Sequence, residues 1–89
     1  MEEDLTKDIE KYEYIKLKMN CYKNYTQYVL NDLNKAISIL EKNSDSVCIS
    51  SYLKELKAIR DNISMNRNRI IYTIIPAIDI KLTQLRNKM

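Results

Sequence analysis

The chain has 89 residues, with 15 lysines and arginines against 12 aspartates and glutamates, and a formal net charge of +3. This length allows one small domain with a thin core, and charges that alternate in sign do not demand a nucleic-acid partner. Histidine is absent, which removes the commonest metal ligand and general base. We therefore expect a non-enzymatic protein without a catalytic site, a metal site or a bound cofactor.

The first predicted helix covers about residues 4–43. Glycine is absent and proline occurs once, so the residues that interrupt helices are almost missing. Apolar residues recur at spacings of three and four, as in a coiled-coil-like seam. The two expected lines of the seam are Leu5, Tyr12, Met19, Thr26, Leu33 and Leu40, and Ile15, Tyr22, Val29 and Ala36. The same apolar stripe also contains Ile9 and Tyr25, and Ile37 is the alternative to Ala36.

The stretch EKNSDS, Glu41 to Ser46, interrupts this pattern with residues that cap helices and form turns. It predicts a turn at about residues 43–47. The start of the next helix remains open, because four residues are plausible N-caps: Asp45, Ser46, Ser50 and Ser51.

The second predicted helix covers about residues 48–87. Its apolar stripe is Ile49, Tyr52 or Leu53, Leu56, Ile59, Ile63, Ile70, Ile74, Ala77 or Ile78, and Leu85. The polar stretch SMNRNR, Ser64 to Arg69, is either a polar layer of this helix or a break that would give three helices.

The isoleucine-rich stretch RIIYTIIPAIDI, Arg69 to Ile80, could span a membrane, form a strand or contact a partner. A membrane span needs about 20 mostly apolar residues, and this run is shorter and is followed by Lys81. A strand would lack a second strand to pair with. We expect a helix that is kinked near Pro76, the only proline.

Together these elements predict an all-α fold, a single domain over residues 1–89 built as an antiparallel two-helix hairpin. Residues 70–80 should lie opposite residues 10–20, which also brings the acidic start against the basic end. A slender hairpin cannot enclose all its apolar residues, so we expect a partner or a second copy to complete a helical bundle. The expected interface is Tyr14, Leu17, Ile71, Tyr72, Ile75 and Leu82. Coverage of these residues within one monomer is the alternative.

Two further residue groups have a structural and a functional interpretation. Cys21 and Cys48 are expected to be free, partly buried thiols. Arg60, Arg67 and Arg69, with tyrosines on the other helix, could contact nucleic acid or could pack over tyrosine rings. The expected neighbouring tyrosines are Tyr22, Tyr25 and Tyr28. This leaves one alternative function, a small phage-type regulator or inhibitor of a nucleic-acid-associated protein.

The two long helices around EKNSDSVC, in a chain of under 100 residues, resemble small helical-hairpin proteins of type VII secretion. The chain looks most like the adaptors that accompany LXG toxins, and the resemblance is architectural. It implies an adaptor or targeting factor that pairs with the helical amino-terminal domain of a toxin. The acidic amino terminus shows no signal peptide, so we expect a cytoplasmic protein that is exported, if at all, with its partner.

Overall fold

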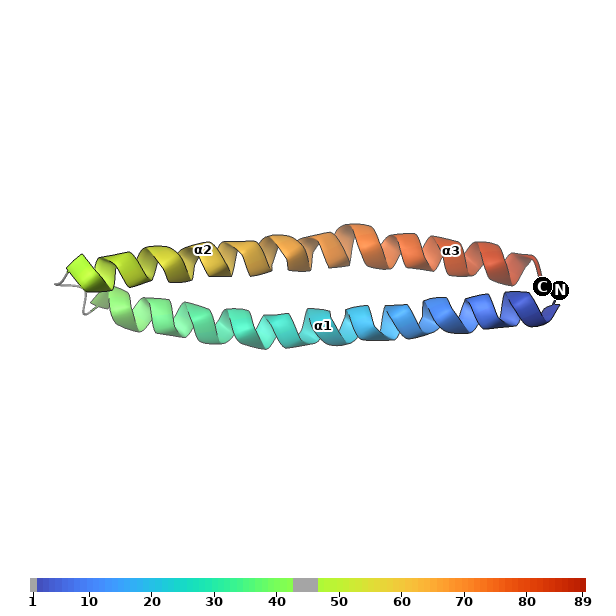
Figure 1. The fold of residues 1–89 in the computed structure, drawn as a ribbon, viewed down its shortest axis with the longest axis horizontal. Coiled ribbons are helices and arrows are strands. Elements are labelled where there is room, and N and C mark those ends of the chain that lie inside the picture. The colour runs from blue at the N-terminus through green and yellow to red at the C-terminus, as the bar shows by residue number, and fades with distance from the viewer. Residues whose placement is uncertain (1, 43–46) are drawn as a thin grey trace. The chain divides into compact units, whose positions relative to one another are not determined.

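The computed structural model describes residues 2–42 and 47–89, and these residues form an all-α helical hairpin (Figure 1). The first arm is one α-helix, α1 (Glu2–Lys42). The second arm consists of α2 (Val47–Arg69), the π-helical segment η1 (Ile70–Ile74) and α3 (Ile75–Asn87). Residues 43–46 of the predicted turn, which include the candidate N-caps Asp45 and Ser46, lie outside the described residues, and Val47 begins α2. Ser50 and Ser51 lie inside α2 and do not cap it.

The hairpin divides into two compact units. Unit 1 comprises residues 1–23 and 68–89, and unit 2 comprises residues 24–67. Within each unit, a stretch of α1 runs antiparallel to a stretch of the second arm, and both chain termini lie in unit 1 (Figure 1). The polar stretch 64–69 does not break the helix, because α2 continues through it to Arg69.

The core of unit 1 is formed by isoleucines and leucines from α1 and α3. Its buried members are Ile9, Ile78, Leu82 and Leu85, against which Leu5, Tyr12, Ile15, Met19 and Ile74 pack. Residues 5–19 of α1 therefore contact residues 74–85 of the second arm, as the predicted pairing requires. Unit 2 buries Leu30 and Ile37 of α1 and Leu53 of α2, with one polar residue, Thr26, only 4% exposed.

One of the two predicted seam lines on α1 is correct and the other is displaced by one residue, although its Ile15 packs against the core of unit 1 and its Val29 and Ala36 are half-buried. The line from Leu5 to Leu40 is buried or half-buried throughout. The second line of the seam is Ile9, Lys16, Lys23, Leu30 and Ile37, all buried or half-buried. The two lysines interrupt its apolar character, although a lysine can place its aliphatic stem along a seam and its ammonium group outside.

The π-helical segment η1 changes which residues of the second arm face the seam. Up to Ile74, the inward-facing residues follow alternating spacings of three and four: Ile49, Leu53, Leu56, Arg60, Ile63, Arg67, Ile70 and Ile74. The same alternation would next bring in Ala77, Lys81 and Gln84, whereas the buried residues are Ile78, Leu82 and Leu85. The sequence therefore contains one residue more than the seam repeat allows.

The wider π turn accommodates this extra residue. The backbone N–H of Ile75 donates to the carbonyl of Ile70, five residues earlier, instead of four as in an α-helix. Pro76 lies at the start of α3, immediately after this turn. A proline there has no N–H to donate, so the loss of one α-helical hydrogen bond costs least at this point. The irregularity of the helix near Pro76 is thus a π-helical segment.

Candidate protein-binding surfaces

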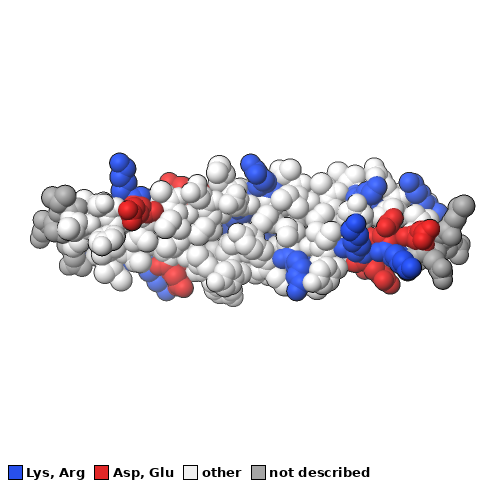
Figure 2. All heavy atoms as spheres, in the orientation of Figure 1, with Lys and Arg blue, Asp and Glu red and all other residues white. Residues whose placement is uncertain are grey.

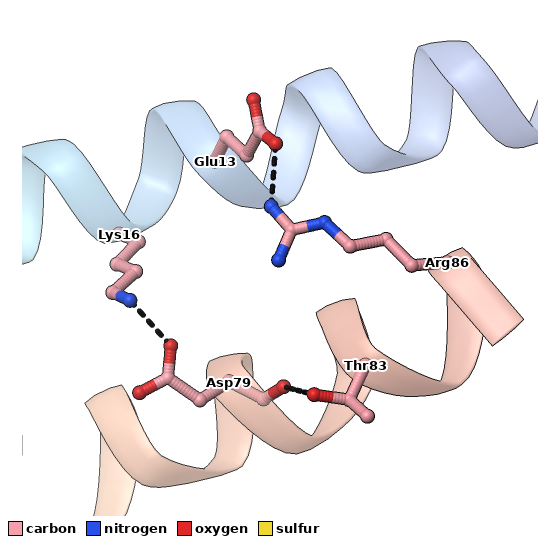
Figure 3. Close-up of polar contacts among 5 residues, drawn as sticks. All are labelled: Glu13, Lys16, Asp79, Thr83 and Arg86. Atoms are coloured by element: carbon pink, nitrogen blue, oxygen red, sulfur yellow. Dashed lines mark hydrogen bonds and ion pairs between the residues drawn. The ribbon is translucent and has the colours of Figure 1, made fainter.

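Interhelical ion pairs mark one edge of unit 1. Lys16 Nζ lies 2.6 Å from Asp79 Oδ1, and Arg86 Nη2 lies 2.7 Å from Glu13 Oε1 (Figure 3). Thr83 Oγ1 also donates to the backbone carbonyl of Asp79 at 3.0 Å. The ion-pairing side chains are about half exposed, so each pair contributes at most about 1 kcal/mol. The two ion pairs show that Glu13 and Lys16 on α1 lie on the same edge of unit 1 as Asp79 and Arg86 on α3.

The six residues of the predicted interface do not form one surface. Leu82 is only 2% exposed and belongs to the core of unit 1. The prediction placed it outside the seam, and in the structure the extra residue that η1 accommodates brings it inward. Ile71 and Ile75 are half-buried and flank the seam beside Asp79. Leu17 is exposed next to Lys16, on the same ion-paired edge.

The two predicted tyrosines lie on opposite outer faces of unit 1. Tyr14 is two residues from the seam residues Tyr12 and Lys16, and therefore about 200° around α1 from each. Tyr72 lies midway between Ile70 and Ile74 in η1, and it is 75% exposed. A rigid partner could not contact both rings on one face. The ammonium group of Lys18 lies 5.3 Å from the centre of the Tyr14 ring.

Unit 2 has a polar edge, which a further ion pair between α1 and α2 identifies. Lys57 Nζ lies 3.5 Å from Glu41 Oε1, so these residues lie on the same edge of α1 and α2. Residues seven positions apart occupy nearly the same place around a helix that follows the seam. The polar edge therefore consists of Gln27, Asn34 and Glu41 on α1 and Ser50, Lys57 and Ser64 on α2.

The opposite edge of unit 2 is apolar. Its residues lie on the other side of each seam line, and we call them the apolar edge: Val29 and Ala36 on α1, both half-buried, and Tyr52 and Ile59 on α2, both exposed. The α2 row ends, seven residues after Ile59, in the exposed polar residue Asn66. Tyr25 and Ile39 continue this edge onto the outer side of α1. Ile59 is 48% exposed and Ile39 is 61% exposed, although isoleucine is normally found inside proteins. The apolar edge was not predicted as an interface, because Val29, Ala36 and Ile59 had been assigned to the seam.

Two acidic residues lie within the apolar edge. Asp32 stands between Val29 and Ala36 at spacings of three and four, and Glu55 stands between Tyr52 and Ile59 in the same way. Both are exposed. On each helix, the apolar edge and its acidic residue belong to two neighbouring rows of positions spaced by seven. Among the described residues of unit 2, these rows hold no lysine or arginine. The exposed Lys35, three residues after Asp32, lies one row further out on α1, so the edge itself carries only the two negative charges.

The remaining candidate groups show no organised chemistry. Cys21 and Cys48 are both free and exposed, whereas partial burial was expected. No group of three or more possible metal ligands occurs among residues 2–42 and 47–89. Arg60 pairs with the neighbouring Asp61 at 3.1 Å and Arg67 is half-buried on the seam, whereas Arg69 is exposed. The three tyrosines predicted near these arginines are also exposed: Tyr22, Tyr25 and Tyr28. Figure 2 shows acidic and basic side chains side by side near the chain termini, with no extended area of one sign on the face drawn.

Comparisons with known proteins assign no family to the chain. Protein-family models, curated proteins and solved structures give no match. Over the described residues, no helix combines the length and apolar character needed to cross a membrane.

Proposed function

We propose that this chain is a non-enzymatic helical adaptor that binds a helical segment of a larger protein. The observation that carries the proposal is the apolar edge of unit 2. A two-stranded coiled coil needs apolar residues only at its two seam lines, whereas a helix in a larger bundle adds a third apolar line on one flank. Val29 and Ala36 supply that third line on α1, and Tyr52 and Ile59 supply it on α2.

The opposite edge gives the contrast that supports this interpretation. If the chain simply carried excess apolar residues, they would occur on both flanks of the seam. Instead, the polar edge has amides, hydroxyls and the Glu41–Lys57 ion pair at all the corresponding positions. Apolar residues confined to one flank are expected where one additional helix packs.

The architectural resemblance to type VII secretion adaptors extends the proposal to a class of partner. On this proposal the partner is the helical amino-terminal domain of an LXG toxin, and binding takes place in the cytoplasm before the partner is exported. The helical hairpin is compatible with that role, and the apolar edge supports a protein partner in general.

The proposal is tested by affinity purification of the tagged, full-length chain from its native cells, with nuclease treatment and a high-salt wash. An apolar helical interface should retain one protein in stoichiometric amount, identified by mass spectrometry, because salt weakens ion pairs far more than apolar contacts. A complex that dissociates at high salt or after nuclease treatment would instead favour a nucleic-acid-associated regulator. Recovery of the chain without any stoichiometric partner would contradict the adaptor function.

A further inference from the structure

We infer that the apolar edge of unit 2 receives an amphipathic helix whose apolar stripe is flanked by lysine or arginine side chains. The inference rests on the proposed adaptor function and specifies the chemistry of its partner. It depends on the position of Asp32 and Glu55, one on each of the two helices that form the edge.

The shape of the edge suits a helix. Val29, Ala36 and Ile39 follow spacings of seven and three along α1, and Tyr52 and Ile59 follow a spacing of seven along α2. Seven residues are about two turns, so Val29 and Ala36 form one row along α1 and Tyr52 and Ile59 form another along α2, with Ile39 beside the α1 row on its outer side. A helix packed along both rows would place its own side chains, spaced by three and four residues, between them.

The two carboxylates disfavour the other occupants of such an edge. A second copy of the chain, packed edge to edge, would bring Asp32 and Glu55 against the same acidic residues of its partner, and like charges in an interface oppose binding. Nucleic acid and anionic membrane surfaces are negative as well, and are disfavoured for the same reason. A helix with basic side chains beside its apolar stripe would pair with both carboxylates and cover the isoleucines.

Burial of the carboxylates makes this charge preference selective. Both are exposed in the free chain, and a docked helix would remove part of their water. A carboxylate that loses water without gaining a cation is strongly unfavourable, whereas one that gains a charge-assisted hydrogen bond is compensated. The edge should therefore discriminate between helices of equal apolar character by the sign of their flanking charges.

The experiment uses two synthetic helical peptides of about 21 residues, or three heptads. Both carry the same leucine stripe, flanked by lysines in one peptide and by glutamates in the other. Binding of each fluorescently labelled peptide to the full-length chain is measured by anisotropy. We expect the lysine peptide to bind about tenfold or more tightly than the glutamate peptide, because two charge contacts change from attraction to repulsion.

Two sets of variants locate the binding. The charge reversal Asp32→Lys with Glu55→Lys should invert the preference, so that the glutamate peptide binds more tightly. Ile59→Asn should weaken binding of the lysine peptide about tenfold, whereas Ser64→Asn, which places the same side chain on the polar edge of α2, should leave binding unchanged. Circular dichroism confirms that each variant keeps its helix content.

Several outcomes would overturn the inference. These are equal binding of the two peptides, no binding of either, and a preference that the charge reversal leaves in place. Self-association of the wild-type chain that Ile59→Asn abolishes would assign the edge to a second copy. If affinity purification nevertheless retains a protein at high salt, the adaptor function stands and only the partner chemistry fails. If it retains none, the adaptor function itself fails.

Discussion

Deletion of Thr73 tests whether η1 holds one residue more than the seam repeat allows. Thr73 is an exposed residue in the middle of the π-helical segment. Without it, Ile70, Ile75, Ile78, Leu82 and Leu85 would follow regular spacings of four, three, four and three. The deletion is best made together with Pro76→Ala, because a continuous α-helix would otherwise carry a proline in its interior at a cost of about 3 kcal/mol.

The two possible results differ by several kcal/mol in the free energy of unfolding. If η1 absorbs the deletion by becoming α-helical, the core of unit 1 stays buried, and the free energy of unfolding should change by no more than about 1 kcal/mol relative to Pro76→Ala alone. If the helix after residue 73 instead rotates by about 100°, Ile78, Leu82 and Leu85 leave the core. Each such side chain stabilises the fold by about 1.5–3 kcal/mol. The loss would approach the whole stability of a small domain, about 5–15 kcal/mol.

A deletion in a regular helix provides the matched control. Ala58 is also exposed and lies in α2, with three inward-facing apolar residues between it and the start of that helix: Ile49, Leu53 and Leu56. No π turn is present there to absorb the change, so its deletion should rotate these residues out of the seam. Urea denaturation followed by circular dichroism compares the variants. The assignment of η1 is refuted if deletion of Thr73 destabilises the chain as much as deletion of Ala58.

Three further measurements test other features of the hairpin. Leu82→Ala should destabilise unit 1 by about 2–5 kcal/mol, as expected for a core leucine, whereas Ile80→Ala at an exposed site should change stability by only about 0.5 kcal/mol; similar effects would return Leu82 to the surface. A double-mutant cycle on Glu13 and Arg86 should give a coupling energy of at most about 1 kcal/mol that decreases with salt, and a larger, salt-insensitive value would show burial that the structure lacks. Both cysteines should react with a thiol reagent in the folded chain as readily as after denaturation, and protection of either would contradict its exposed position.

The sequence predicts the helical hairpin because several independent features along the chain favour long helices. The absence of glycine, the single proline and one uninterrupted apolar line from Leu5 to Leu40 all favour long helices. The pairing of residues 10–20 with 70–80 also follows from the sequence and appears in the structure as the Lys16–Asp79 ion pair. These predictions succeed because they depend on many residues, so no single exception changes the result.

The errors arise where one or two residues decide the helical face. Lys16 and Lys23 occupy inward-facing positions, and a reading that requires apolar residues moves the seam line to Ile15 and Tyr22 instead. A signal for η1 was present in the sequence, since only an extra residue can bring both Ile74 and Leu82 into the seam. It could not be recognised from periodicity alone, because Ala77 and Ile78 were both acceptable at the ambiguous position.

The displaced seam line matters for function because it conceals the apolar edge. Leu30 and Ile37 are the buried residues of the second seam line, and Val29 and Ala36 lie half-buried on its flank, where on the proposed function their exposed sides would contact a third helix. The Glu41–Lys57 ion pair then has a role larger than its small contribution to stability. It occupies the opposite flank with charged groups that a docking helix could not desolvate without cost. On the proposed adaptor function, one flank of unit 2 would therefore receive an apolar helix and the other would not, which favours a three-helix arrangement over binding on both sides.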